Sequence, residues 1–471
     1  MRLGCCMGAL SMIEPAFARR RLPGGARGWR ATILHGLRDA IQNWSLWATF
    51  SLSPLGGRGQ GEGAGVFYPK HSSVGWRAGI LGLCLCLGGA VGGQEPPPAK
   101  KPASARQASE QALADLLALD PELAKELQLP KFSTWDTSFS LLTGAGYKDN
   151  LLLGYHNPQA SGFSHLVGEF TLWRLPDRGW QFYAYLLGDD IRYFSSEVVK
   201  KEQVLMALAQ LKKDFDSGWR WTLGHQYLYF DQVLDVSSSQ DLLTPLPVTG
   251  HSFSPKTALR RDLARSNWVE IELELMRQSF ALPLDDYWEA GPRLTLGRNY
   301  GHKSEVSVGY EFNRRFYDTR RATDAGGVEI PGAELTYDLH RLDAVWKHHF
   351  DAKRRWQAVT RVIFERNADS GAGYYDYWKY QFGEQLRFHQ GRWDLRGQLK
   401  WTRYDYRLKK AGPATDALLE RALLALEFKA EFEVAKGLKL FAEYQFERSL
   451  SNDPLNRYRV NTFGTGLNWE F

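Results

Sequence analysis

From residue 134 to the C-terminus, polar and apolar residues alternate with a period of two over one segment after another. In the segment 268–276, for example, Val269, Ile271, Leu273 and Leu275 fall on one side and three glutamates fall on the other. Successive side chains of an extended strand point to opposite faces, so this pattern predicts strands with one dry face and one wet face.

Short turns alternate with longer loops between these segments. The pattern predicts sixteen strands, at residues 134–146, 160–175, 180–194, 200–215, 219–234, 249–262, 267–280, 288–297, 303–318, 334–350, 355–366, 373–388, 393–409, 418–434, 438–448 and 457–471. The longer loops are expected at residues 148–159, 235–248, 281–286, 319–333, 367–372, 410–417 and 449–456.

The length of these segments and the character of their two faces favour a membrane barrel over a soluble sandwich. Most exceed the about five to six residues of a typical soluble strand, and crossing a membrane takes about 9–11 tilted residues. Aromatic residues gather at segment ends, as at Trp219 and Trp221 or Tyr404 and Tyr406. Unpaired backbone groups are costly in lipid, so the sheet must close. The fold class predicted is all-β: a closed transmembrane antiparallel β-barrel of about sixteen strands, with a short helical N-terminal segment.

The charge of the chain is unevenly distributed. The net charge is +6, but residues 1–93 hold ten Lys/Arg and three Asp/Glu, whereas the remainder holds 49 and 50. The basic excess therefore belongs to the front of the chain, and no nucleic-acid partner is expected. All four cysteines also lie in the front part, which excludes disulfides and thiolate metal sites from the rest.

The front of the chain is expected to be processed. Residues 76–93 combine one arginine, an apolar core and a run of small residues, which is typical of a secretory signal peptide. Residues 1–75 are then either the product of a start codon placed too early, with the true start near Val74, or a disordered extension. Residues 94–133 are predicted to be a Pro-rich linker followed by a short periplasmic helix.

The end of the chain carries a second signal. Phe463, Leu467, Trp469 and Phe471 share one face, and Phe471 is the last residue. This end resembles the C-terminal strand of Gram-negative outer-membrane β-barrel proteins. The resemblance implies a bacterial outer-membrane location and recognition of these four residues by the barrel assembly machinery. The sixteen-strand count is similar to that of the general porins, while residues 143–150 loosely resemble the opening of barrels that export polysaccharide or assemble surface lipoproteins.

If the apolar faces meet lipid, the alternate residues point into the lumen. A wet lumen of sixteen strands is wide enough for water, and its charges would set solute preference. Equally, these charges could simply solvate and cross-pair the inner wall. The candidate pore-lining residues are Glu270, Glu272, Glu274, Glu289, Arg293, Glu311, Arg315, Arg361, Lys379, Arg387, Arg396, Lys400, Glu427, Lys429, Glu431, Lys439 and Glu443.

The functional expectation is a porin-like channel for passive passage of small hydrophilic solutes. The alternatives are a barrel that exports or assembles polysaccharide or surface lipoprotein, and a structural barrel with a blocked lumen. The loop at residues 235–248 either folds inward to narrow the pore or lies outside it. The expected partners are outer-membrane lipid, the assembly machinery, small solutes and further copies of the chain.

No catalytic centre is apparent. The sequence holds no GxSxG, HExxH or phosphate-binding loop in a supporting context, so no enzyme activity, metal or cofactor is predicted. His348 and His349 are adjacent on one expected strand and should point to opposite faces. His225 has no partner identifiable in the sequence.

Overall fold

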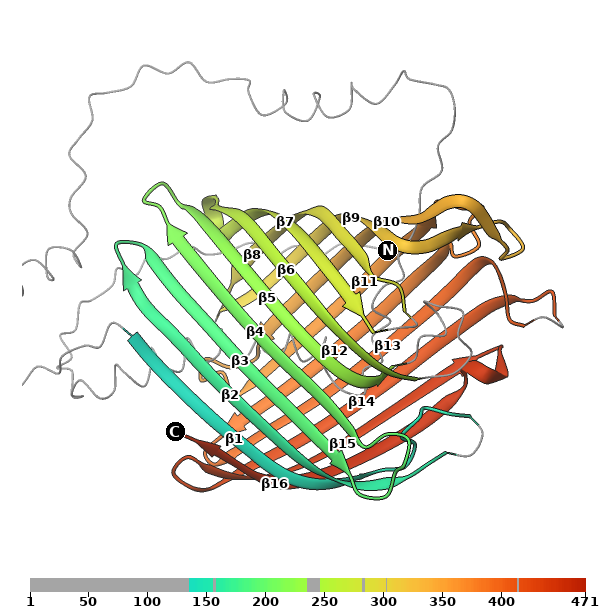
Figure 1. The fold of residues 1–471 in the computed structure, drawn as a ribbon. Coiled ribbons are helices and arrows are strands. Elements are labelled where there is room, and N and C mark those ends of the chain that lie inside the picture. The colour runs from blue at the N-terminus through green and yellow to red at the C-terminus, as the bar shows by residue number, and fades with distance from the viewer. Residues whose placement is uncertain (1–134, 156–157, 235–245, 282–283, 302, 413–414) are drawn as a thin grey trace, which may run out of the picture. The chain divides into compact units, whose positions relative to one another are not determined.

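The barrel is closed and antiparallel (Figure 1). A computed structural model describes residues 135–155, 158–234, 246–281, 284–301, 303–412 and 415–471. Within them, sixteen strands hydrogen-bond to their neighbours in chain order, and β16 pairs with β1 to complete the ring. No helix of these residues is long and apolar enough to cross a membrane. The expected extension at 1–75, signal peptide at 76–93 and linker with helix at 94–133 lie outside the described residues.

The strands take up most of the described chain. They are β1 (Trp135–Lys148), β2 (Ser161–Asp177), β3 (Trp180–Tyr193), β4 (Lys201–Asp214), β5 (Trp219–Leu234), β6 (Leu246–Asp262), β7 (Asn267–Phe280), β8 (Tyr287–Tyr300), β9 (Ser304–Thr323), β10 (Glu329–His349), β11 (Trp356–Asp369), β12 (Tyr377–Gln390), β13 (Trp393–Lys410), β14 (Leu418–Ala435), β15 (Leu438–Ser451) and β16 (Tyr458–Glu470). Two single-turn 3-10 helices, η1 (Ala264–Ser266) and η2 (Pro454–Asn456), lie between strands.

The predicted strand number is confirmed, but the expected loop at 319–333 is wrong. The chain there continues as a hairpin, with β9 reaching Thr323 and β10 starting at Glu329, and these two residues pair. Ala322 and Leu335 are fully buried beside a group of tyrosines at this end of the barrel. Burial of these small and branched side chains holds the hairpin in place.

Several further boundaries differ from expectation by three or four residues: β8 ends at Tyr300, β11 at Asp369 and β15 at Ser451, and the starts of β6 and β12 also differ. Strand β6 begins at Leu246, so the last three residues of the expected loop 235–248 belong to a strand. Strand β12 begins at Tyr377 rather than at residue 373. The Asp369 carboxylate accepts hydrogen bonds from the backbone N–H groups of Gly371, Gly373 and Tyr375, at 2.6–2.9 Å. These bonds fold the segment as a turn and remove it from the sheet.

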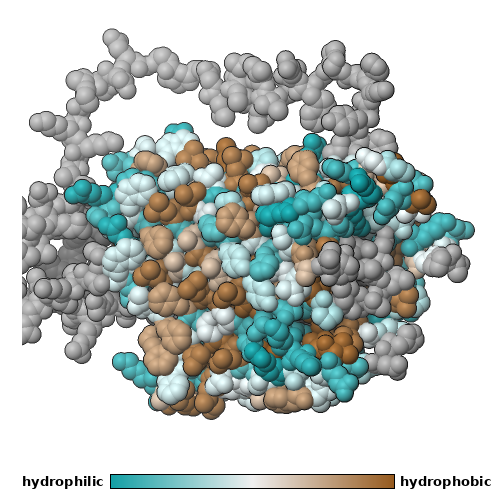
Figure 2. Space-filling view, in the orientation of Figure 1, coloured by the Kyte–Doolittle hydropathy of each residue, from teal (hydrophilic) through white to brown (hydrophobic). Residues whose placement is uncertain are grey.

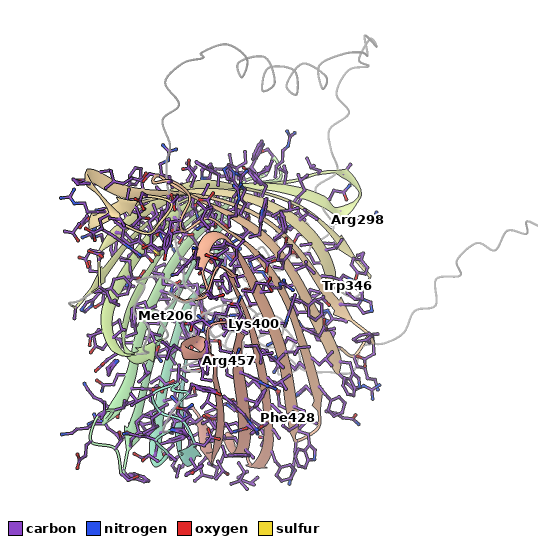
Figure 3. All side chains as sticks on the ribbon, turned by 90° about the vertical axis from the view of Figure 1, so that its right-hand side faces the viewer. Met206, Arg298, Trp346, Lys400, Phe428 and Arg457 are labelled. Atoms are coloured by element: carbon purple, nitrogen blue, oxygen red, sulfur yellow. The ribbon has the colours of Figure 1, made fainter. Side chains whose placement is uncertain are left out.

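The outer face of the barrel is an apolar band. Ile271 is 55% exposed and Phe428 is 51% exposed, and both lie in the middle of their strands. Figure 2 shows such hydrophobic side chains spread over the face in view. Trp346 and Phe428, labelled in Figure 3, belong to this outer face, whereas Met206 and Lys400 occupy alternate positions on the inner one. So much exposed apolar surface is stable only against lipid.

The closed ring and its apolar band place the protein in the bacterial outer membrane. Strands of 13 to 21 residues exceed the about 9–11 needed to cross a bilayer. Lipid-exposed sheets must close on themselves, and this one does.

The two ends of the barrel differ in their connections. At one end lie short turns, such as the two residues between β14 and β15. Strand β1 begins at this end, and strand β16 ends there. In that turn Gly437 has a φ of +76°, and a Cβ would come within 2.5 Å of the Glu470 carbonyl oxygen. Short turns are periplasmic in outer-membrane barrels, so the longer loops are extracellular.

Candidate functional site: the inner wall of the barrel

All seventeen candidate pore-lining residues lie on the inner face, opposite the apolar band. The register shows it strand by strand: Arg293 on β8 lies across from Glu272 on β7 and from Glu311 on β9. Likewise, Lys379 on β12 lies across from Glu365 on β11. The structure therefore brings these side chains to one surface.

The inner face of β8–β12 carries a network of ion pairs, here called the central cluster. Arg293 contacts Asp343 at 2.7 Å and Glu311 at 3.1 Å. Arg341 contacts Glu311 at 3.3 Å and Glu365 at 2.8 Å. These bonds join β8, β9, β10 and β11 through alternating charges.

Two further cations complete the central cluster. Lys379 lies 3.4 Å from Glu365, and Arg361 lies 3.9 Å from Asp343. The cluster thus contains four cations and three anions. Two of its carboxylates, Asp343 and Glu365, are almost fully buried, with only 2% and 1% of their side chains exposed. Because each anion contacts two cations, little of this charge is left uncompensated.

A glycine allows the contact of the central cluster that crosses an intervening strand. Arg293 on β8 reaches Asp343 on β10 across the intervening strand β9, where Gly309 lies between them. A Cβ at Gly309 would come within 2.9 Å of the Arg293 guanidinium and 3.0 Å of the Asp343 carboxylate. The absence of a side chain there permits the contact.

A second network joins β12, β13 and β14. Asp394 accepts from Arg387 at 2.6 Å and from Arg396 at 3.2 Å. Glu431 lies 3.1 Å from Lys429 and 3.8 Å from Arg396. Five oppositely charged groups therefore pair across three strands, which supports the expectation that the inner charges cross-pair.

Glu274 differs from these paired groups. It lies on the inner face of β7 and is exposed, and it forms no ion pair with the described residues. Its carboxyl group is therefore left without a cation partner among the described residues.

The inner faces of β3–β5 carry an apolar strip between charged residues, which lie toward the ends of the strands. This strip, which sequence reasoning missed, is shielded from solvent, and Met206 is 1% exposed. Its members are Tyr185, Ile191, Val204, Met206, Leu208, Leu228 and Phe230. Its sequence signal is the unbroken apolar run 204–209 on β4, where alternation disappears because both faces are dry.

The histidines singled out in the sequence belong to no metal-binding group among the described residues. His225 lies on the outer face of β5, with its ring 4.2 Å from the Phe253 ring. His348 and His349 point to opposite faces, and His348 bonds the Tyr300 hydroxyl at 3.1 Å. Among the described residues, no group of three His, Cys, Asp or Glu side chains is arranged to hold a metal ion.

The C-terminal aromatic residues lie on the outer face at the closing seam. Phe463, Leu467 and Trp469 are exposed on β16. The Phe471 N–H donates to the Phe139 carbonyl of β1 at 2.9 Å, and the two rings are 5.7 Å apart. The expected loop constriction at 235–248 lies outside the described residues, apart from its last three positions.

Deleting Phe471 is expected to lower several-fold the amount of folded barrel in the outer membrane. The deletion removes the terminal aromatic of the proposed assembly signal and one seam contact. The measurement is the heat-modifiable band on gels of purified outer membranes. Refolding of the same variant into detergent should be nearly unchanged, and an equal loss there would point to a purely structural role.

The comparisons with known proteins give no family. No model of a protein family matches the chain, and neither does any curated protein. Among solved structures, a loop L8 deletion mutant of OmpT, an outer membrane protein of Vibrio cholerae, is 10% identical and has a TM-score of 0.37, covering 72% of this chain and 100% of that one. OccAB1 of Acinetobacter baumannii is 7% identical, covering 72% and 96%, with a TM-score of 0.39. OccK1 of Pseudomonas aeruginosa is 11% identical, covering 71% and 98%, with a TM-score of 0.35. With TM-scores this low, none of these likenesses bears on function. The assignment of the fold as a barrel rests on the pairing of the strands.

Proposed function

We propose that this protein is a porin-like channel for the passive passage of small hydrophilic solutes and is not an enzyme. The observation that supports this most is the concentration of ionisable side chains on the inner face of a closed sixteen-stranded ring, opposite an apolar outer face. A polar inner wall of this strand number is wide enough to carry water and solutes.

The paired charges favour weak ion selectivity. In the central cluster and in the network of β12–β14, each carboxylate is neutralised by adjacent cations. A neutralised wall attracts neither cations nor anions strongly, so the solutes of such a channel would be sorted by size more than by charge.

One observation favours the blocked-lumen alternative. Several inner-face side chains are almost fully shielded from solvent, among them Met206 on β4 and Asp343 on β10. An inner wall lined by open water would expose such groups. The export or assembly alternative would involve residues 94–133, which lie outside the described part of the chain, and it stays a prediction.

Conductance of the purified, folded full-length protein in planar bilayers separates these functions. The channel proposal expects discrete steps with nearly equal permeability to potassium and chloride. Absence of channel events from folded protein would contradict it and support a blocked lumen.

Glu274→Lys is expected to shift the selectivity of this channel toward anions. The variant replaces an inner-face carboxyl group by a cation, so the local charge becomes more positive. The reversal potential in a salt gradient measures the shift. Asp416→Asn, in the extracellular loop between β13 and β14, is the control and should leave the reversal potential near its wild-type value. Equal effects of the two variants would place Glu274 outside the ion path.

A further inference from the structure

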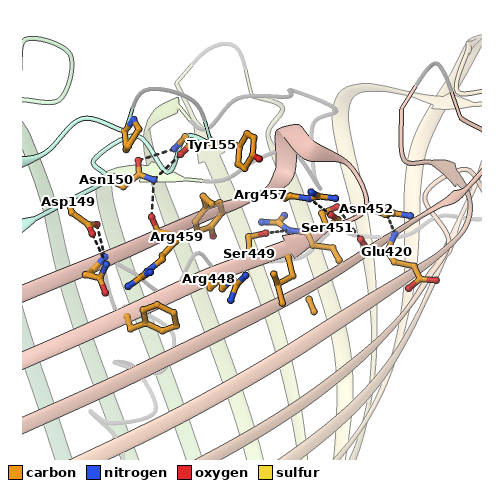
Figure 4. Close-up of a pocket in the computed structure, with 18 of the residues that line it drawn as sticks. Asp149, Asn150, Tyr155, Glu420, Arg448, Ser449, Ser451, Asn452, Arg457 and Arg459 are labelled. Carbon is orange, nitrogen blue, oxygen red and sulfur yellow. Dashed lines mark hydrogen bonds between the residues drawn. The ribbon is translucent and has the colours of Figure 1, made fainter.

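The extracellular rim of the barrel holds a groove outside β14–β16 (Figure 4). It encloses about 1170 Å³ between the ends of these strands, the loop that follows β1 and the loop that contains η2. Five arginines and two carboxylates line it, so its formal charge is +3. Figure 4 shows Arg448 and Arg459 next to each other on the wall, and Arg457 nearer the loops.

Arg448 and Arg459 form a like-charge pair on the outer face. They are directly opposite each other in the register of β15 and β16. Both side chains are exposed, and among the described residues neither forms an ion pair. Like charges placed opposite each other across two strands repel, so this pair costs stability unless an anion joins it.

The carboxylates of the groove are already engaged. Glu420 lies 3.1 Å from Arg403 on the neighbouring strand. Asp149 accepts from the backbone N–H and the side-chain amide of Asn461, at 2.7 Å and 2.6 Å. Both acids thus have other partners, and among the described residues neither forms an ion pair with Arg448 or Arg459, which leaves the positive charge of the pair for a partner outside the chain.

The height of the pair matches the outer membrane surface. Arg448 lies ten residues beyond Leu438, which follows the short periplasmic turn. A tilted strand climbs about 25 Å over that length, which equals the height of the apolar band of such barrels. The outward aromatic residues Tyr444 and Phe463 lie four residues lower on their strands and mark the membrane interface. The arginines thus sit at the level of the lipid headgroups of the outer leaflet.

The groove also offers an apolar surface beside its cations. The Arg459 guanidinium lies 5.6 Å from the Phe446 ring centroid, and Leu450 is exposed on the same face. Arginine binds phosphate through two parallel hydrogen bonds, and two neighbouring arginines can share one phosphate.

From this arrangement we infer that the groove binds a phosphate group carried by an outer-leaflet lipid. Arg448 and Arg459 hold the phosphate, Arg457 adds charge from the loop side, and Phe446, on the membrane side of the pair, contacts the acyl region. The site would fix the barrel in its lipid surroundings and does not depend on what passes through the lumen.

Lipid binding to the full-length protein in detergent micelles tests this inference. The probes are diphosphoryl lipid A, its dephosphorylated form and inorganic phosphate, followed by native mass spectrometry. The wild type is expected to prefer diphosphoryl lipid A over the dephosphorylated form by about tenfold, since charge-assisted bonds to phosphate are strong. The variant Arg448→Gln/Arg459→Gln should lose that preference.

Arg298→Gln is the matched control. Arg298 is an exposed outward arginine near the periplasmic end of β8, and among the described residues it forms no ion pair. This control should keep the wild-type preference. If Arg448→Gln/Arg459→Gln does not fold, Arg448→Lys/Arg459→Lys replaces it, and this variant should show a reduced preference because lysine lacks the bidentate geometry.

Three results would overturn the inference. They are equal binding of the two lipid A forms by the wild type, an unchanged preference in the double variant, and an equal loss in Arg298→Gln. Binding of inorganic phosphate as tight as that of diphosphoryl lipid A would also overturn the lipid assignment, and it would identify a site for free phosphate.

Discussion

Replacing Ile271 by arginine is expected to lower the free energy of unfolding in lipid bilayers by about 2–4 kcal/mol, the cost of a cation near the bilayer midplane. Ile271 is one of the two middle residues of the outward row formed by Val269, Ile271, Leu273 and Leu275. In a water-soluble protein, a side chain this exposed would tolerate arginine with little change. The prediction therefore depends on the outer face meeting acyl chains.

The control for Ile271→Arg is Val328→Arg. Val328 is 65% exposed and lies at the tip of the β9–β10 hairpin, outside the membrane. This control should change stability by less than about 0.5 kcal/mol, as surface substitutions do. Reversible denaturant unfolding in phospholipid vesicles, followed by tryptophan fluorescence, measures both. Equal effects of the two substitutions would contradict the lipid-facing assignment of β7.

The strands could be predicted because one face of each strand meets lipid and the other meets water, and this imposes alternation of apolar and polar residues. On β7 the alternation of leucine, isoleucine and valine with glutamate is complete, and its predicted bounds agree with the structure. Where both faces are dry, as on β4, alternation fails, and the apolar inner strip was missed. The β12 start was misplaced because hydrogen bonds to Asp369, which no periodicity reports, decide it.

The partners of the inner charges were beyond sequence reasoning for a different reason. Alternation says which face a residue occupies, but the register decides which residues meet. Asp343, Glu365 and Arg341 sit at the centre of the ion-pair network and were absent from the candidate residues. The contact between Arg293 and Asp343 spans three strands and depends on the space left by Gly309. The outer arginine pair likewise becomes visible only when β15 and β16 are aligned.

Glu365→Gln is expected to lower the free energy of unfolding by about 3 kcal/mol, because removing one partner of a buried ion pair leaves the other charge uncompensated. The Glu365 carboxylate accepts from Arg341 at 2.8 Å and from Lys379 at 3.4 Å. Arg341 retains Glu311 in the variant. Lys379 has no second carboxylate among the ion pairs of the described residues. Its uncompensated ammonium group is therefore expected to cause most of the loss of stability.

A second substitution separates the charge effect from a loss of packing. In Glu365→Gln/Lys379→Met, the uncompensated ammonium is removed together with the carboxylate, and replacing a buried pair in this way is often close to neutral. The double variant should therefore regain most of the stability lost by Glu365→Gln, which a double-mutant cycle measures as a coupling energy. Glu197→Gln, on the exposed loop between β3 and β4, is the control and should leave stability unchanged. If Glu365→Gln were as mild as this control, the carboxylate would be hydrated in the lumen, and the wall charges would be available to passing ions after all.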